Sequence, residues 1–451
     1  MHSLDGLTRS RTKEPQPPHV RRRKRKFFVL LVFLFIIAAL GLSSSKILSK
    51  TNKIFTNKEN TFVRIGKFLV SNEKKLQGED SGKVNILLLG MGGEGHEGPL
   101  LTDTMIVAQI DVETSEVILI SIPRDFLVQL PKRGFSKINA AYAWAESATP
   151  GAGGEAAMQA AEKVTGFEIP YFASIDFKGF TKAVDHVGGL EIEVEKTFTD
   201  SQYPDNRNWY LPPVTFKKGM EHMDGTRALQ FARSRKGNNG EGSDFARSAR
   251  QKKILSAFKD KVKTLNITDA KTINNLLADF TDHFRTNLEP HELKRLGTLG
   301  EKISEENIYS LSLEPDGSLI CDALIEDYTN RAYVIQPCEG KTLSDVHDYL
   351  KDAVLISKLS KEGATIEIQN STGKSYVTQP FKGLSKYGLD VSFVTFKGKT
   401  PYVRTILYEN RKGQKPKTLD YLKSLYQMDM ADVPFSSSTA DFVIVIGKNL
   451  L

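Results

Sequence analysis

The stretch that decides the fold runs over residues 84–125 and reads VNILLLGMGGEGHEGPLLTDTMIVAQIDVETSEVILISIPRD. It contains three apolar runs of strand length, at 84–90, 104–111 and 116–123. Apolar runs of this kind, bounded by turn residues, are typical of strands buried on both faces of a sheet. Only a short turn at 112–115 separates the second and third runs, which predicts that these two strands are neighbours.

Helical patterns alternate with further strand-like runs after this stretch. We expect strands at 171–177 and 190–195 and helices at 154–166, 177–189, 224–232, 244–264, 270–285 and 290–303. Strands mixed with helices in this order imply an α/β or α+β body. A hydrophobic content of 40% supports a globular body and excludes a largely disordered chain.

The last stretch of the chain has a pattern of its own. The expected order is strand 364–369, helix 375–388, strands 389–396 and 401–408, helix 416–427 and strand 441–447. This β-α-β-β-α-β order predicts a second, small α+β domain. The charged run just before it, at 356–362, is expected to be a linker.

The N-terminus predicts a membrane anchor. Residues 1–26 hold nine Lys or Arg and two acids, so they carry +7 of the formal net charge of +8. Residues 27–45 contain no charge over 19 residues, about the length that crosses a bilayer as a helix. No A-x-A cleavage site follows, which favours an uncleaved anchor over a signal peptide. The positive-inside rule then places the basic tail in the cytoplasm and the body outside, with a polar, Lys-rich stalk at 46–83.

A second informative stretch, FARSRKGNNGEGSDFARSARQ at 231–251, holds four arginines, Arg233, Arg235, Arg247 and Arg250. If Arg233 and Arg235 lie on an extended segment, their side chains point to the same side. Asp244, Arg247 and Gln251 share one face of a helix. The glycines between the two sets can turn the chain back, so the sets can face one another around an anion. The alternative is a solvated face with surface ion pairs.

Two further residues stand next to predicted strands. Arg124 follows the third apolar run, and ligands usually bind beyond the ends of strands in α/β sheets. Asp103 precedes the second run. Arginines with one carboxylate suit a phosphate or pyrophosphate together with Mg²⁺, which typically binds one or two carboxylates and substrate phosphates. The alternatives are an arginine paired with Asp125 and an aspartate that caps a turn.

The chain has two cysteines, Cys321 and Cys338, each next to a strand-like run. Outside the membrane a disulfide is permitted, and two buried thiols are the alternative.

Several motifs occur in one order over about 170 residues: LLLG, LLTDTMIV, ISIPRD, KINAAYA, VDHVGGL, MDGTRALQFARSR and DFARSARQ. In this ordered set the chain resembles the LytR–CpsA–Psr (LCP) family of bacterial envelope enzymes. The resemblance implies a membrane-anchored, mixed-sheet α/β catalytic domain at 84–355 and a LytR-type C-terminal domain at 363–451. It also implies a phosphotransferase that moves teichoic acid or capsule chains from a polyprenyl-pyrophosphate lipid to peptidoglycan in cell wall biogenesis.

The resemblance assigns roles by matching motif. It implies pyrophosphate binding by Arg124, Lys137, Arg233, Arg235, Arg247 and Gln251, assistance from Asp244, and Mg²⁺ binding by Asp103. Of these, Arg124, Arg233, Arg235 and Asp244 would be catalytic. The family often has a second metal-ligating Asp just after LLLG, where this chain has GMGGEGHEG. Glu94 or Glu97 would then substitute, or the metal would be held weakly or not at all.

Three rival functions use the same residues or the same fold. They are a polyprenyl-pyrophosphate hydrolase with water as the acceptor, a non-catalytic envelope-binding protein, and a transcriptional attenuator. The near-neutral charge of the body beyond the basic tail argues against nucleic acid as a partner. The expected partners are therefore the lipid-linked glycan, peptidoglycan and membrane lipid.

Overall fold

A computed structural model describes residues 75–450 except 205–209, 235, 243–245, 247–249, 251–252, 255–256, 259, 262–282, 327–330 and 426–427. The backbone alone is described at Pro290, Lys294, Glu305, Glu326 and Arg331. Within these ranges no helix combines the length and the apolar character needed to cross a bilayer. The predicted basic tail, the anchor at 27–45 and most of the stalk lie outside them.

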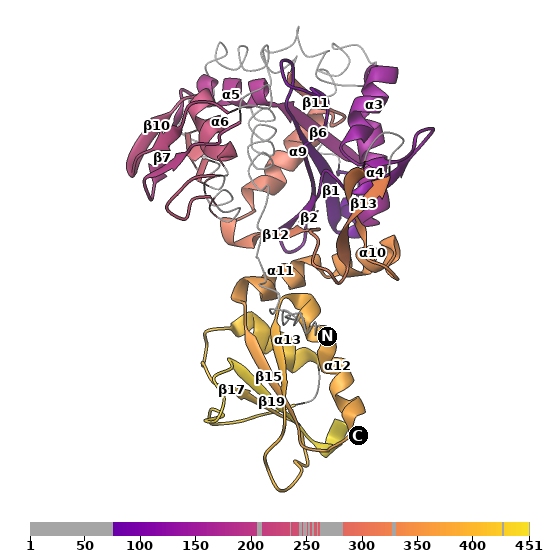
Figure 1. Cartoon of the computed structure of the whole chain (residues 1–451), viewed down its shortest axis with the longest axis vertical. Helices are drawn as coiled ribbons and strands as arrows, with labels where there is room; N and C mark the ends of the chain where they lie inside the picture. Colours follow the sequence, from indigo (N-terminus) through magenta and orange to yellow (C-terminus); the bar gives the residue numbers. More distant parts are fainter. Residues whose placement is uncertain are drawn as a thin grey trace, which may run out of the picture.

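The larger unit is built on a six-stranded mixed sheet in the order β11-β6-β1-β2-β3-β12 (Figure 1). Its strands are β1 (Lys83–Met91), β2 (Thr104–Asp111), β3 (Glu116–Ile122), β6 (Tyr171–Asp176), β11 (Phe284–Thr286) and β12 (Ile308–Ser312). β2 is antiparallel to both β1 and β3, whereas β6 is parallel to β1 and β12 is parallel to β3. The three strands predicted from the opening stretch are therefore confirmed, and they form the centre of a mixed sheet.

Both faces of this sheet are covered, because successive residues of the central strands enter different cores. In β1, Ile86 and Leu88 belong to one core, and Leu87 and Leu89 belong to the other. The first core includes α5 (Phe177–His186), α6 (Gly225–Arg233) and α9 (Pro290–Glu301); the second includes α3 (Ala140–Ala148), α4 (Gly153–Thr165) and α10 (Leu343–Lys351). Each fully buried aliphatic side chain stabilises the fold by roughly 1.5–3 kcal/mol.

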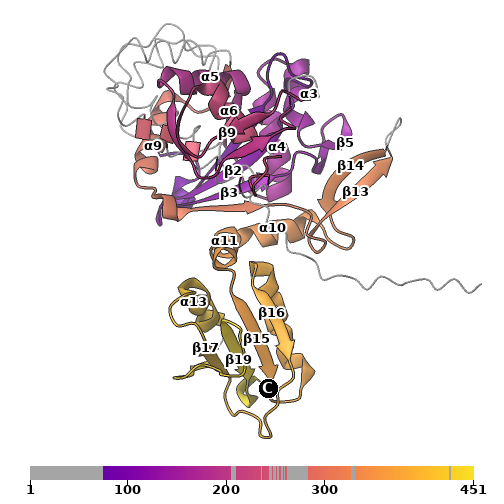
Figure 2. The same ribbon diagram turned by 60° about the vertical axis from the view of Figure 1, so that its left-hand side comes forward.

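The described residues also form four two-stranded antiparallel sheets: β4 (Leu127–Leu130) with β5 (Gly134–Lys137), β7 (Leu190–Val194) with β10 (Gly219–Met223), β8 (Phe198–Asp200) with β9 (Val214–Phe216), and β13 (Ile320–Glu326) with β14 (Arg331–Pro337). The β13–β14 hairpin projects from the unit in Figure 2. A disulfide joins Cys321 to Cys338 at its base, so of the two alternatives for the cysteines the bonded one is confirmed.

The smaller unit has a five-stranded sheet in the order β16-β15-β19-β17-β18 (Figures 1 and 2). Its strands are β15 (Thr365–Asn370), β16 (Asp390–Val394), β17 (Ile406–Glu409), β18 (Asp429–Met430) and β19 (Phe442–Ile446). Where one helix was expected at 375–388, the structure has a short α12 (Gln379–Lys382) between the 3-10 segments η4 (Ser375–Thr378) and η5 (Gly383–Tyr387). Strand β17 begins at Ile406 rather than at 401, because the N–H of Tyr402 donates to the Ser371 hydroxyl instead of to a strand partner.

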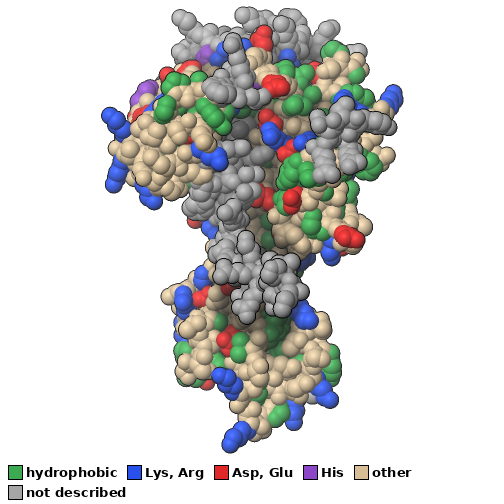
Figure 3. All heavy atoms as spheres, in the orientation of Figure 1, with side chains coloured by type: hydrophobic (Ala, Val, Ile, Leu, Met, Phe, Trp, Pro, Cys, Tyr) green, Lys and Arg blue, Asp and Glu red, His purple; other side chains and the backbone are tan. Residues whose placement is uncertain are grey.

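Residues 356–362, expected to be a linker, lie within helix α11 (Ala353–Glu362). This helix contacts both units. Lys358 pairs with Glu116 of the larger unit at 2.6 Å, and Leu359 is buried in the core of the smaller one. The charged run is therefore part of a helix that packs against both units. On the face shown in Figure 3, basic and acidic side chains are intermixed over the larger unit.

The end of α11 also caps the first turn of α13 (Pro416–Leu425). The Glu362 carboxylate accepts hydrogen bonds from the N–H of Lys417 at 2.9 Å, the N–H of Thr418 at 2.8 Å and the Thr418 hydroxyl at 2.6 Å. A side chain from another helix thus supplies the acceptor that an N-cap residue usually supplies.

Replacing Glu362 by alanine should therefore destabilise α13 by about 1–2 kcal/mol, the typical cost of losing a helix cap. Hydrogen exchange of the α13 amides measures this loss. The charge-matched control is Asp420→Ala, which removes an exposed acid from the same helix. Equal protection of α13 in the two variants would contradict the capping role.

Candidate functional site

One edge of the large sheet gathers residues that are far apart in the sequence. The registers Met91↔Asp176, Gly90↔Thr104 and Met105↔Ile122 place the end of β1, the end of β6, the start of β2 and the end of β3 at this edge. Strands lie about 4.8 Å apart, so the ends of β6 and β3 are separated by roughly 15 Å. We call this edge the ligand edge.

Arg124 and Asp103 meet at the ligand edge. Nη1 of Arg124 lies 2.8 Å from Oδ1 of Asp103, and both side chains are about half exposed. Burial alone would lower the pKa of Arg124, but Asp103 and then Asp125 raise it, so the guanidinium stays charged. An ion pair this exposed is worth about 0–1 kcal/mol, so an incoming phosphate can replace the carboxylate at little cost.

The KINAA motif holds Arg124 in place. The Asn139 N–H donates to the Arg124 carbonyl at 3.2 Å, and the Thr102 N–H donates to the Asn139 carbonyl at 3.1 Å. Lys137 lies nearby, but its Nζ is 2.7 Å from Oδ1 of Asp125. Lys137 therefore contacts the carboxylate of the residue that follows Arg124.

Arg233 reaches the ligand edge from α6. This helix starts at Asp224, whose side chain caps it by accepting from the Arg227 N–H at 2.7 Å. The Arg233 guanidinium lies 4.3 Å from the ring centre of Phe177, the residue that follows Asp176 at the end of β6, and 5.4 Å from the ring centre of Tyr203. These cation–π contacts, together with a hydrogen bond to the Tyr203 hydroxyl, hold the Arg233 guanidinium at the ligand edge.

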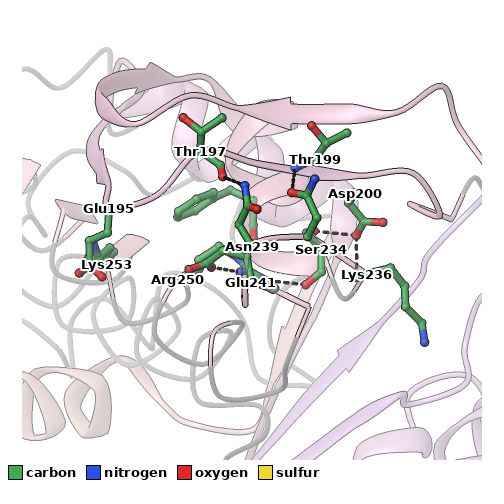
Figure 4. Close-up of polar contacts among 12 residues, drawn as sticks. Glu195, Thr197, Thr199, Asp200, Ser234, Lys236, Asn239, Glu241, Arg250 and Lys253 are labelled. Carbon is green, nitrogen blue, oxygen red and sulfur yellow. Dashed lines mark hydrogen bonds and ion pairs between the residues drawn. The ribbon is translucent and has the colours of Figure 1, made fainter.

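The expectation of an extended Arg233–Arg235 segment needs a correction. Arg233 is the last residue of α6, and the non-helical backbone starts at Ser234, with φ −54° and ψ 130°. Asp200 fixes the backbone just after the helix. Its Oδ2 accepts from the Ser234 hydroxyl at 2.6 Å and from the Lys236 N–H at 3.0 Å (Figure 4). The helix continues to Arg233 because its buried Phe231 and Ala232 belong to the core behind it.

Arg250 is a structural arginine, although it belongs to the same cluster in the sequence. Only 3% of it is exposed, and its Nη2 donates to the Ser234 carbonyl at 2.6 Å. Its Nε donates to the Phe231 carbonyl at 3.1 Å, and Nη1 pairs with Glu241 at 2.5 Å (Figure 4). Arg250 therefore ties the end of α6 to the following loop. The remaining predicted residues, Arg235, Asp244, Arg247 and Gln251, lie outside the described residues.

The glycine-rich loop after β1 brings a residue that the motifs did not indicate. The His96 ring packs edge-on against Phe177, with ring centres 5.2 Å apart. Burial lowers the pKa of His96 and the charge of Arg233 lowers it further, whereas Asp103 and Asp176 raise it. His96 is thus close enough to interact electrostatically with both Arg233 and Asp103. Asp103 in turn contacts Arg124. A lone histidine between glycines carries no helical or strand period, so sequence reasoning passed over it.

The family resemblance implies a bound Mg²⁺, and the side chains at the ligand edge show what kind of Mg²⁺ site they could form. Among the described residues, no three His, Cys, Asp or Glu side chains are grouped so that they could hold a metal ion. Glu94 pairs with Lys178 at 3.1 Å, and Asp103 is the carboxylate in contact with Arg124. These residues fit an ion that takes most of its ligands from phosphate and water, and they do not fit an all-protein cage.

The structure is that of a mixed-sheet α/β protein in which Arg124, Asp103 and Arg233 lie at one edge of the sheet. The chain belongs to the LytR_cpsA_psr family, whose sequence model matches residues 44–345. The resemblance drawn from the ordered motifs is therefore confirmed.

Two relatives are named as teichoic acid transferases. The chain is 29% identical over 317 residues to "polyisoprenyl-teichoic acid–peptidoglycan teichoic acid transferase TagU" of Oceanobacillus iheyensis, covering 69% of this chain and 91% of that protein. It is 28% identical over 300 residues to the transferase TagV of Bacillus subtilis, covering 65% of this chain and 71% of TagV. A crystal structure of B. subtilis TagV is 27% identical, with a TM-score of 0.42, covering 60% of this chain and 97% of that one.

Proposed function

We propose that the protein transfers a glycopolymer from a polyprenyl-pyrophosphate carrier to peptidoglycan, as a phosphotransferase in cell wall biogenesis. The observation that carries the proposal is that Arg124 and Arg233, more than a hundred residues apart in the chain, lie at the same sheet edge. Arg124 contacts Asp103 there, and His96 lies within the electrostatic influence of both Asp103 and Arg233. The names of its relatives as teichoic acid transferases support the same reaction and the same substrate class.

The chemistry asked of this site is mainly positioning and charge stabilisation. A sugar hydroxyl of the acceptor attacks the phosphorus next to the glycan and loses its proton to solvent, and the bond from that phosphorus to the bridging oxygen breaks. The electron pair leaves with the lipid phosphate, where negative charge grows. Arginine forks fixed by Phe177 and by the KINAA segment can hold the diphosphate in line and stabilise that charge.

Residues outside the described ranges complete the proposal. By their motif positions, Arg235, Arg247 and Gln251 join the diphosphate site, and Asp244 orients the arginines or assists the transfer. Among the described residues, Asp103 would supply one carboxylate to Mg²⁺. When bound, the ion neutralises phosphate charge.

We also propose that residues 27–45 anchor the protein as a single membrane span, with the basic tail in the cytoplasm and the catalytic unit outside. A carrier lipid in the outer leaflet then meets an enzyme fixed to the same membrane. The smaller unit would be the LytR-type C-terminal domain.

The test uses the full-length chain in vesicles with a labelled polyprenyl-pyrophosphate oligosaccharide, Mg²⁺ and purified peptidoglycan. Transfer predicts that label becomes covalently attached to sedimented peptidoglycan, and that this depends on the acceptor. A hydrolase would release label into solution at the same rate without peptidoglycan. A non-catalytic binder would retain label on the protein, with no product in either fraction.

A further inference from the structure

We infer that the imidazole of His96 is a further binding group for the diphosphate, acting beside Arg233. The inference rests on the proposed function and deepens it by adding a ligand residue. His96 lies in the loop that leaves β1 at the ligand edge. The loop is fixed by hydrogen bonds from the Gly93 N–H to the Pro99 carbonyl at 3.0 Å and from the His96 N–H to the Gly93 carbonyl at 3.2 Å.

Two glycines make room for the histidine and its neighbours. A Cβ at position 92 would lie 2.8 Å from Cβ of His96 and 3.0 Å from its Cγ, so the ring folds back directly over Gly92. Gly93, at φ +79°, has the side chain of Asp176 at 2.8 Å from the place of a Cβ. The two residues that follow β1 therefore carry no side chain, and the imidazole lies over Gly92.

One aromatic ring positions both His96 and Arg233. Phe177 contacts the His96 ring edge-on at 5.2 Å and lies under the Arg233 guanidinium at 4.3 Å. Because Phe177 follows the last residue of β6, its place is set by the sheet. The imidazole and the guanidinium are thus held by one rigid support, as two groups that bind one ligand need to be.

His96 differs from the other histidines in its hydrogen bonding. The other five histidines of the described ranges each have a polar partner: His186 with the Lys182 carbonyl, His222 with Glu191, His283 with Asp176, His291 with Glu289 and His347 with the Lys163 carbonyl. For the half-buried His96, no partner of either ring nitrogen is found among the described residues. A polar group in such a place usually meets water or a ligand.

The charges around His96 indicate which ligand fits. Of the nearby carboxylates, Asp176 accepts from the Gly179 N–H at 2.7 Å and contacts His283 at 2.8 Å, and Asp103 contacts Arg124 at 2.8 Å. The remaining charge facing His96 is that of Arg233. An imidazole N–H beside a guanidinium suits a phosphate oxygen, because both groups donate hydrogen bonds to it.

Binding of inorganic pyrophosphate to the full-length protein in detergent, measured by calorimetry, tests the inference. We expect His96→Ala to weaken binding roughly tenfold, the loss of one hydrogen bond to a charged group. His96→Gln, which keeps a donor, should stay within about threefold of the unmodified protein. Gly92→Ala should bind as weakly as His96→Ala, because its methyl group displaces the ring while the imidazole remains.

Two further variants separate the possible failures. His222→Ala, at an exposed histidine paired with Glu191, should bind pyrophosphate normally. Arg233→Ala should bind weakly. If Arg233→Ala binds weakly and both His96→Ala and Gly92→Ala bind normally, the inference about His96 is wrong while the proposed site stands. If Arg233→Ala and His96→Ala both bind normally, the diphosphate site itself is wrong.

Discussion

Replacing Arg233 by alanine should lower the rate of transfer to peptidoglycan by roughly 10²–10³, the usual effect of removing one preorganised group that stabilises developing charge. Its guanidinium is held over Phe177 at 4.3 Å before any ligand binds, so little reorganisation is needed when the diphosphate arrives. Arg233→Lys should recover only a small part of the rate, because an ammonium neither stacks as a plane nor donates two parallel hydrogen bonds. Initial rates with the labelled oligosaccharide lipid measure both variants.

Arg124→Ala should lower the rate of transfer by a similar factor, because the Arg124 guanidinium lies at the same sheet edge, beyond the end of β3. The matched control is Arg404→Ala in the smaller unit, which removes an exposed arginine paired with Asp429 and should leave the rate unchanged. Thermal unfolding of all variants shows whether they are folded. A folded Arg233→Ala protein with undiminished transfer would refute the arginine site.

The sequence predicted best those features that depend on neighbouring residues in the chain. The apolar runs at 84–90, 104–111 and 116–123 predicted buried strands, because a strand covered on both faces needs apolar residues at every position. Arg124 was found for the same reason, since it follows directly where such a run ends. The end of α4 was also predicted, since the helix expected at 154–166 ends at Gly166, which caps α4 in the left-handed conformation at φ +71°.

Features that depend on contacts between distant segments could not be predicted. Arg250 has the same sequence context as its neighbours, and only the fold shows that carbonyls of Phe231 and Ser234 surround it. Arg233 was expected on an extended segment, but the hydrophobic core extends α6 to include it. Residues 356–362 were expected to be a linker because the run is charged. The partner of Lys358 in this run, Glu116, lies far away in the sequence and could not be identified from it.

Asp200 was not indicated by any motif, yet it should be the most important residue for positioning the segment after Arg233. It is 1% exposed, and its carboxylate also accepts from the Gln202 N–H at 3.0 Å. With Ser234 and Lys236 donating to the other oxygen, three donors depend on one buried anion. Removing this acceptor leaves the buried Ser234 hydroxyl unsatisfied, at about 1–3 kcal/mol, and also removes two part-buried hydrogen bonds from backbone N–H groups.

We therefore expect Asp200→Ala to lower the free energy of unfolding by about 3 kcal/mol or more and to reduce transfer strongly in the molecules that remain folded. Ser234→Ala removes one of the three hydrogen bonds and should cost about 1 kcal/mol. Asp200→Asn should fall between them, because its carbonyl oxygen can still accept from Ser234 and Lys236 while its amide group faces the Gln202 N–H.

Two measurements separate positioning from general stability. Hydrogen exchange at the Lys236 amide should accelerate most in Asp200→Ala, since that N–H donates directly to the carboxylate. Pyrophosphate affinity of the folded protein should fall in parallel, because the arginine segment loses its fixed point. If Asp200→Ala lowers the free energy of unfolding but the folded protein binds pyrophosphate normally, Asp200 serves only the fold, and contacts such as those of Arg233 with Phe177 and of Arg250 with the Ser234 carbonyl are sufficient to position the segment.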